Sequence, residues 1–167
     1  MADTYTLISS VTVGAGGASS IDFTSIPATY TDLLVKLSSR NTSTGGAIYL
    51  RFNGSTSSYT VRYLEGNGAA ASSGTDSTYL YVSELNTSST TASTFSSADI
   101  YIPNYAGSTN KSVSADSVSE NNATTAYAGI YAGLWSNTSA ITQVTLYPSA
   151  NTFAQYSTAY LYGIKNS

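Results

Sequence analysis

The sequence predicts an all-β protein, folded as a jelly-roll-like antiparallel β-sandwich in a single domain. Short apolar runs and alternations recur along the whole chain, and clusters of turn-forming residues separate them. That pattern is typical of a sandwich or a barrel. The chain is also rich in Tyr, with 15 among 167 residues, and Tyr favours the pleated, half-buried surface of a strand. No window of helical length carries an apolar stripe at three-to-four spacing.

The apolar segments define eleven expected strands. Their residue ranges are 5–13, 20–25, 32–39, 47–52, 59–64, 78–85, 95–102, 111–119, 126–135, 141–147 and 159–164. Many strands without a helix protect their edges by closing into two packed sheets, and a chain of this length normally makes one domain. We therefore expect one domain over residues 1–167. Residues 1–10 are alternatively an N-terminal arm or a strand exchanged with a neighbouring chain.

The alternation is clearest in residues 126–135. One face carries aromatic rings spaced by glycines, and the other carries small and aliphatic side chains: Tyr127, Gly129, Tyr131, Gly133 and Trp135 against Ala128, Ile130, Ala132 and Leu134. We expect the aliphatic face to be core and the aromatic face to meet a neighbouring strand or chain. The simpler interpretation is that both faces are buried inside a two-sheet sandwich, as is common for a central strand.

The composition argues against catalysis, cofactors and metals. The chain has no His and no Cys, and only 9% of its residues are charged, so the usual groups for proton transfer near neutral pH, thiolate chemistry and soft-metal binding are missing. A net charge of -3 with six scattered cations argues against nucleic acid as a partner. Neither a secretory signal nor an apolar run long enough for a bilayer is present. We expect a soluble protein made in a cytoplasm, with no membrane partner.

Few residues offer an alternative chemistry. Asp99 and Asp116 lie on consecutive expected strands and could form the carboxylate pair of a glycosidase. The simpler interpretation is a surface ion pair with Lys111 or Arg62. Asp76, or Glu120 beside two asparagines, could hold calcium loosely. The simpler interpretation is an ordinary loop capped by its own side chains.

Carbohydrate binding has two candidate platforms. Aromatic rings beside amides and hydroxyls occur at residues 135–137 and 101–105, and such rings can stack on the apolar face of a sugar. Large aromatic side chains are mainly core and interface residues, so packing inside the protein or between subunits is the competing explanation.

Five segments, taken in order, resemble a family of small structural proteins of tailed bacteriophages, which occur as free virion proteins and as modules of larger appendages. They are residues 21–33, 49–54, 100–107, 132–137 and 159–164. The resemblance covers nearly the whole chain. It implies a virion protein with a β-sandwich fold, and the family supplies no catalytic motif.

Within that family, the size and acidity of the chain favour a capsid decoration or cement protein. Such a protein is a homotrimer that binds the major capsid protein on the outer capsid surface, stabilises the shell and is synthesised in the host cytoplasm. The alternative is a receptor-binding or glycan-binding module of a tail or head fibre. Exposed aromatic and arginine side chains near loops are the expected contact residues. These are Tyr30, Arg40, Tyr59, Arg62, Tyr105 and Tyr156.

Overall fold

The computed structural model describes residues 4–122 and 126–165, and this part of the chain is all-β. Its strands are β1 (Tyr5–Thr12), β2 (Ile21–Phe23), β3 (Asp32–Ser39), β4 (Ala47–Phe52), β5 (Tyr59–Gly66), β6 (Ala71–Asp76), β7 (Leu80–Glu84), β8 (Ser96–Ile102), β9 (Lys111–Val118), β10 (Ala128–Trp135), β11 (Val144–Pro148) and β12 (Thr158–Ile164). The described residues contain no helix long and apolar enough to cross a membrane.

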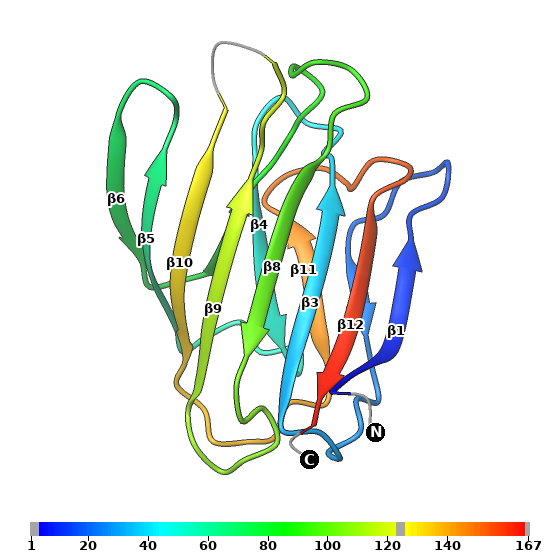
Figure 1. The fold of residues 1–167 in the computed structure, drawn as a ribbon, viewed down its shortest axis with the longest axis vertical. Helices are drawn as coiled ribbons and strands as arrows, with labels where there is room; N and C mark the ends of the chain where they lie inside the picture. Colours follow the sequence, from blue (N-terminus) through cyan, green and yellow to red (C-terminus); the bar gives the residue numbers. More distant parts are fainter. Residues whose placement is uncertain (1–3, 123–125, 166–167) are drawn as a thin grey trace.

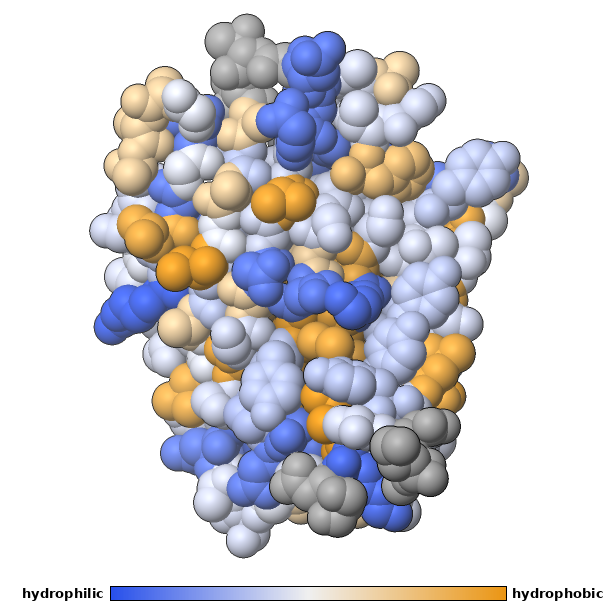
Figure 2. Space-filling view, viewed as in Figure 1, coloured by the Kyte–Doolittle hydropathy of each residue, from blue (hydrophilic) through white to orange (hydrophobic). Residues whose placement is uncertain are grey.

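Two antiparallel sheets face each other (Figure 1). The larger sheet has the order β1-β12-β3-β8-β9-β10-β5-β6, and the smaller has the order β2-β11-β4-β7. Four strands of the larger sheet, β1-β12-β3-β8, and the whole smaller sheet form an eight-stranded jelly roll. The predicted fold class is therefore confirmed. The outer face of the larger sheet is turned to the viewer in Figure 2.

Two hairpins are added to this jelly roll. The β5–β6 hairpin lies between β4 and β7 in the chain, and the β9–β10 hairpin lies between β8 and β11. Both join the larger sheet beyond β8, because β9 pairs with β8 and β10 pairs with β5. We call the four strands β9, β10, β5 and β6 the extension. At its far edge, β5 and β6 lie to the side of the smaller sheet (Figure 1).

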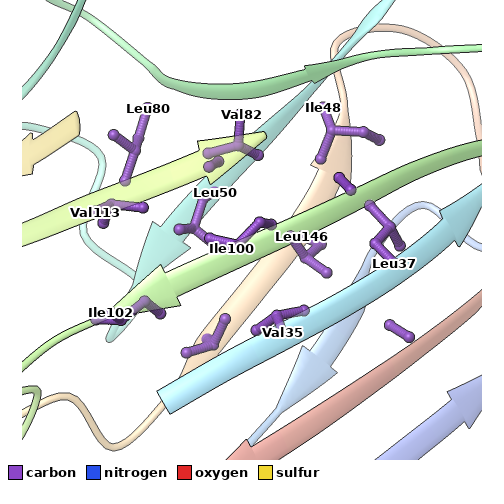
Figure 3. Close-up of a cluster of buried hydrophobic side chains, with 14 of the residues drawn as sticks. Val35, Leu37, Ile48, Leu50, Leu80, Val82, Ile100, Ile102, Val113 and Leu146 are labelled. Carbon is purple, nitrogen blue, oxygen red and sulfur yellow. The ribbon is translucent and has the colours of Figure 1, made fainter. Parts of the chain in front are cut away.

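The hydrophobic core lies between the two sheets, where alternate residues of each strand point inward. In β3, for example, Leu33 and Val35 are fully buried, while Lys36 between Val35 and Leu37 is exposed. Figure 3 shows side chains of this core converging from both sheets, including Ile100 of β8 and Leu50 of β4. The alternation that predicts these strands is the same one that fills the core.

All eleven expected strands are present, and β6 is an additional one. Residues 72–77 read as a turn, since β6 has no apolar run. It pairs with β5 from Gly66 to Val61. Gly74 lies under the ring of Tyr63, where a Cβ atom would overlap the ring. The strand therefore depends on its neighbour rather than on its own hydrophobic pattern.

The N-terminal segment lies in the sheet of its own chain. Tyr5–Thr12 pairs with β12, and the register shifts once, between Leu7 and Ser9. Of the expected arm or exchanged strand over residues 1–10, the first three residues lie outside the described part of the chain.

Lys111, at the start of β9, is fully buried. Its ammonium group donates to the carbonyl oxygens of Gly107 at 2.6 Å and of Thr109, so the lysine holds the loop before β9 in place. Desolvation lowers the pKa of Lys111.

Candidate functional site

The two faces of β10 are the reverse of our expectation. Tyr131 and Trp135 are buried at 3% and 2% exposure, whereas Ile130 is 59% exposed. A Cβ atom on Gly133 would overlap the side chain of Leu80, so the glycine makes room for the smaller sheet against this face. The prediction that the aliphatic face forms the core is wrong, because alternation separates two faces without saying which one points inward.

The outward aliphatic side chains of β10 join others from β5 and β9. Ile130 lies directly opposite Leu64, which is 50% exposed. Ala128 lies opposite Val118, which is 49% exposed. We call Leu64, Val118, Ala128, Ile130 and Ala132 the extension patch. Apolar atoms gather over this part of the sheet in Figure 2.

The extension patch is hollowed on both sides of Ile130 and Leu64. One hollow of about 480 Å³ is bordered by Arg62, Ser114 and Ala132. The other, of about 460 Å³, is bordered by Ala71, Val118 and Ala128. Small side chains beside two large ones produce this relief. The surface can therefore receive protruding side chains of a partner on either side of a central ridge.

A charged row continues the line of this ridge across the sheet. Ile130 is followed by Asp116, then Asp99, then Lys36 in successive cross-strand pairs. Lys36 Nζ donates to Asp99 Oδ2 at 2.6 Å, and this hydrogen bond raises the pKa of Lys36. The row appears as a hydrophilic band beside the apolar atoms in Figure 2.

The two candidate carboxylates of a glycosidase are thus direct cross-strand neighbours. They lie on an open sheet face, and the cation bound to Asp99 is Lys36, not Lys111 or Arg62 as expected. Lys111 is buried elsewhere. This arrangement favours a surface ion pair.

Two of the expected contact residues are buried. Tyr59 is 3% exposed, and its hydroxyl accepts a hydrogen bond from the backbone N–H of Phe52 at 2.9 Å. Tyr105 is fully buried, and its hydroxyl donates to the carbonyl oxygen of Pro27. The expectation that these rings are exposed contacts is wrong, because both hydroxyls have partners inside the fold.

The side chain of Arg40 forms hydrogen bonds within its own chain. Its guanidinium group donates to the carbonyl oxygens of Thr91 and Thr94 at 2.9 Å and of Thr90 at 3.1 Å. It therefore holds the loop between β7 and β8 in a fixed shape, as a planar fork of five donors can.

The other three expected contact residues lie far apart. Arg62 is exposed beside Ala132, at the border of the extension patch. Tyr30 is half-buried and lies against Gly163. Tyr156 is 68% exposed, in a left-handed backbone conformation between β11 and β12. Of the six expected contact residues, the structure brings only Arg62 to the candidate surface. The large exposed side chains there, Leu64, Val118 and Ile130, were not among the expected contacts.

The expected sugar platforms are mostly inside the protein. Trp135 and Tyr105 are buried, which excludes them as stacking surfaces in this fold. Tyr101 is 37% exposed, and its hydroxyl donates to Asp32 Oδ2 at 2.8 Å. Of the aromatic rings in these two segments, Tyr101 remains a candidate for stacking on a sugar.

A network of tyrosines and carboxyl groups links the two sheets behind the extension. Tyr131 donates to Glu65 Oε1 at 2.9 Å. The hydroxyl of Tyr81, on the smaller sheet, contacts Glu65 Oε1 and lies 2.5 Å from Glu84 Oε1. A hydroxyl has one hydrogen, so satisfying both contacts requires a proton on one carboxyl group. Burial raises the pKa of Glu84, and repulsion from Glu65 adds to this rise.

This raised pKa predicts a specific pH dependence of stability. Relative to its usual value near 4.5, a raised pKa means that Glu84 stabilises the fold fully below that pH. The contribution is lost as pH rises through the folded-state pKa. We expect the free energy of unfolding of Glu84→Gln to rise relative to that of the native protein as pH increases from 4 to 8. Urea titrations across that range measure the difference, and parallel curves would contradict the expectation.

The described residues contain no group of three or more acidic side chains able to hold a metal ion. Asp76 Oδ1 accepts backbone hydrogen bonds from Thr78 and Tyr79, and Glu120 Oε1 accepts one from Asn122. Both acids therefore cap their own loops. Residues 123–125, which follow Asn122, lie outside the described part of the chain.

Comparisons with protein-family models, with curated proteins and with solved structures find no match for this chain.

Proposed function

We propose that this protein is a structural component of a bacteriophage virion that binds the outer capsid surface as a decoration protein. The single observation that carries the proposal is the extension patch. Leu64, Val118 and Ile130 each expose about half or more of their surface, on neighbouring strands of a rigid sheet. Contiguous apolar surface of this kind marks interaction sites in soluble proteins.

The chemistry of the patch suits a protein partner. An apolar centre beside a charged row, with Arg62 at the border, has the layout of a protein interface with a hydrophobic centre and a polar rim. The sheet holds these side chains without a loop that must be ordered on binding. The sequence resemblance to virion proteins of tailed bacteriophages supplies the partner class, the major capsid protein.

The mode of action follows from mass action. A homotrimer that contacts several capsid subunits binds only the assembled shell, and such binding stabilises that state by the free energy of association. No catalytic step is required. Attachment through a sheet face would stabilise the assembled shell for as long as the protein stays bound.

The proposal predicts that charge on the patch abolishes attachment. Recombinant protein is added to particles that lack it, and occupancy is measured by quantitative mass spectrometry. Ile130→Asp, at a side chain 59% exposed, should lower occupancy by at least about tenfold, since a charge at the centre of an apolar interface costs more than about 1.4 kcal/mol.

The matched control is Leu7→Asp, at a side chain 50% exposed on the opposite edge of the same sheet. It should leave occupancy unchanged. Equal occupancy of both variants and the native protein would overturn the assignment of the patch. Absence of the protein from purified virions of its source would overturn the virion role itself. Copies on the order of hundreds per particle support decoration, whereas about a dozen support a tail or fibre position.

The alternative function is a glycan-binding module of a tail or head fibre. The observation in its favour is the exposed ring of Tyr101 with its hydroxyl fixed on Asp32, because a ring beside polar groups suits a sugar. A glycan array tests it directly, and binding lost in Tyr101→Ala would replace the decoration role with this one.

A further inference from the structure

A second concave site lies on the opposite side of the β5–β6 hairpin from the extension patch. Residues of the β5–β6 hairpin face residues of β4 and of β7, the edge strand of the smaller sheet. The resulting pocket, which we call the tyrosine notch, has a volume of about 220 Å³. It is lined by Ala47, Tyr49, Tyr63, Thr75, Asp76, Tyr81 and Glu84.

The walls of the tyrosine notch are aromatic and meet nearly at right angles. The rings of Tyr63 and Tyr81 have centroids 5.2 Å apart and an interplanar angle of 85°. The rings of Tyr49 and Tyr81 have centroids 6.5 Å apart and an interplanar angle of 77°. Tyr79, stacked on Tyr49 at 4.6 Å, supports this wall from outside. Several tyrosine rings therefore border one space, and aromatic rings gathered in this way can bind organic cations.

The charge of the notch is negative. The lining carboxyl group outside the tyrosine network is that of Asp76, while Glu84 shares one proton with Glu65, and none of the residues that border this pocket is a Lys or Arg. Asp76 Oδ1 accepts two backbone hydrogen bonds, while its Oδ2 has no hydrogen-bond partner among the described residues. Glu65, buried behind Tyr81 and bonded to its hydroxyl, adds to the field. A carboxylate beside aromatic rings favours a cationic ligand over a neutral one.

The same tyrosine cluster already holds one cation of the chain. The guanidinium carbon of Arg51 lies 4.5 Å from the ring centroid of Tyr147, and Tyr147 contacts Tyr49 edge-on at 5.6 Å. Tyr49 also lines the notch, and no arginine borders that pocket.

We propose that the tyrosine notch binds a small organic cation, an alkylammonium or quaternary ammonium group. The volume sets the size of the ligand, because drug-sized molecules occupy pockets of roughly 300–1,000 Å³. A headgroup with few heavy atoms fits instead. This site is independent of the proposed virion role, since it uses the other face of the hairpin.

The test compares two probes of the same shape. Choline and its neutral analogue 3,3-dimethyl-1-butanol are titrated into the intact protein at constant ionic strength, and tyrosine ring resonances are followed by NMR. Choline should produce saturable shifts of the notch tyrosines, and the neutral analogue should not. Equal binding of the two probes, or no saturable shift with choline, would overturn the proposal.

Variants locate the site. Tyr49→Leu should weaken choline binding by about tenfold, the loss expected for one cation–π wall. Asp76→Asn keeps the Oδ1 acceptor for its own loop and removes the charge, and it should weaken binding by about threefold to tenfold. Tyr160→Leu, at a tyrosine 39% exposed on β12, is the control and should bind as the native protein does. Native affinity in both notch variants would show that choline binds elsewhere.

Discussion

Replacing Trp135 with alanine is expected to lower the free energy of unfolding by about 3–5 kcal/mol. The side chain is 2% exposed. Its ring centroid lies 5.6 Å from that of Phe52 on the smaller sheet and 6.2 Å from that of Tyr59 on β5. It therefore joins the jelly roll to the extension, and its removal leaves a cavity that neither sheet can close. Urea denaturation followed by circular dichroism measures the loss.

The control for this prediction is on the same strand. Ile130→Ala removes an aliphatic side chain that is 59% exposed, and the cost should stay below about 1 kcal/mol. The ratio of the two losses reports which face of β10 is core. A larger loss for Ile130 than for Trp135 would contradict the orientation of the strand.

The second large effect is expected from Glu65→Ala, which should lower the free energy of unfolding by about 2–4 kcal/mol. The carboxylate accepts hydrogen bonds from the hydroxyls of Tyr131 and Tyr81, and both rings are buried. Alanine leaves two buried hydroxyls without this acceptor. Because Tyr131 and Tyr81 belong to opposite sheets, the substitution also loosens the contact between the sheets.

Glu65→Gln separates the acceptor from its charge. The amide oxygen can still accept, so this variant should lose less than half as much stability as Glu65→Ala. It also removes the repulsion that contributes to the raised pKa of Glu84, so its stability should fall less between pH 4 and 8. Equal losses in the two variants would show that the network depends on the charge of Glu65 rather than on its hydrogen bonds.

The fold could be predicted because the period-two pattern and the turn-forming clusters are local signals. In residues 32–39 the apolar side chains of Leu33, Val35 and Leu37 are buried and Lys36 is exposed, as the alternation of the sequence predicts. The strand β6 could not be predicted, because Ala71–Asp76 carries no apolar pattern. Its place depends on the free edge of β5 and on Tyr63 lying over Gly74, both of which are tertiary facts.

The candidate site was harder to predict than the fold. Aliphatic side chains are usually buried, which predicts a core position for those of β10. The same reasoning predicts contacts among tyrosines near loops. In this protein several tyrosines are core residues whose hydroxyls find partners inside, as Tyr59 and Tyr131 do. The one available signal was the glycine spacing around Tyr131, which indicates a tightly packed face.

The inserted hairpins impose an order in time on the folding of this chain. The β5–β6 hairpin is synthesised early, yet its partner in the larger sheet is β10, which begins more than sixty residues after β5 starts. Until β10 emerges, the inner side chains of β5 have no sheet to join. Pairings across such sequence distances fold slowly. The extension patch, which draws on β5, β9 and β10, is therefore complete only once β10 has joined the sheet.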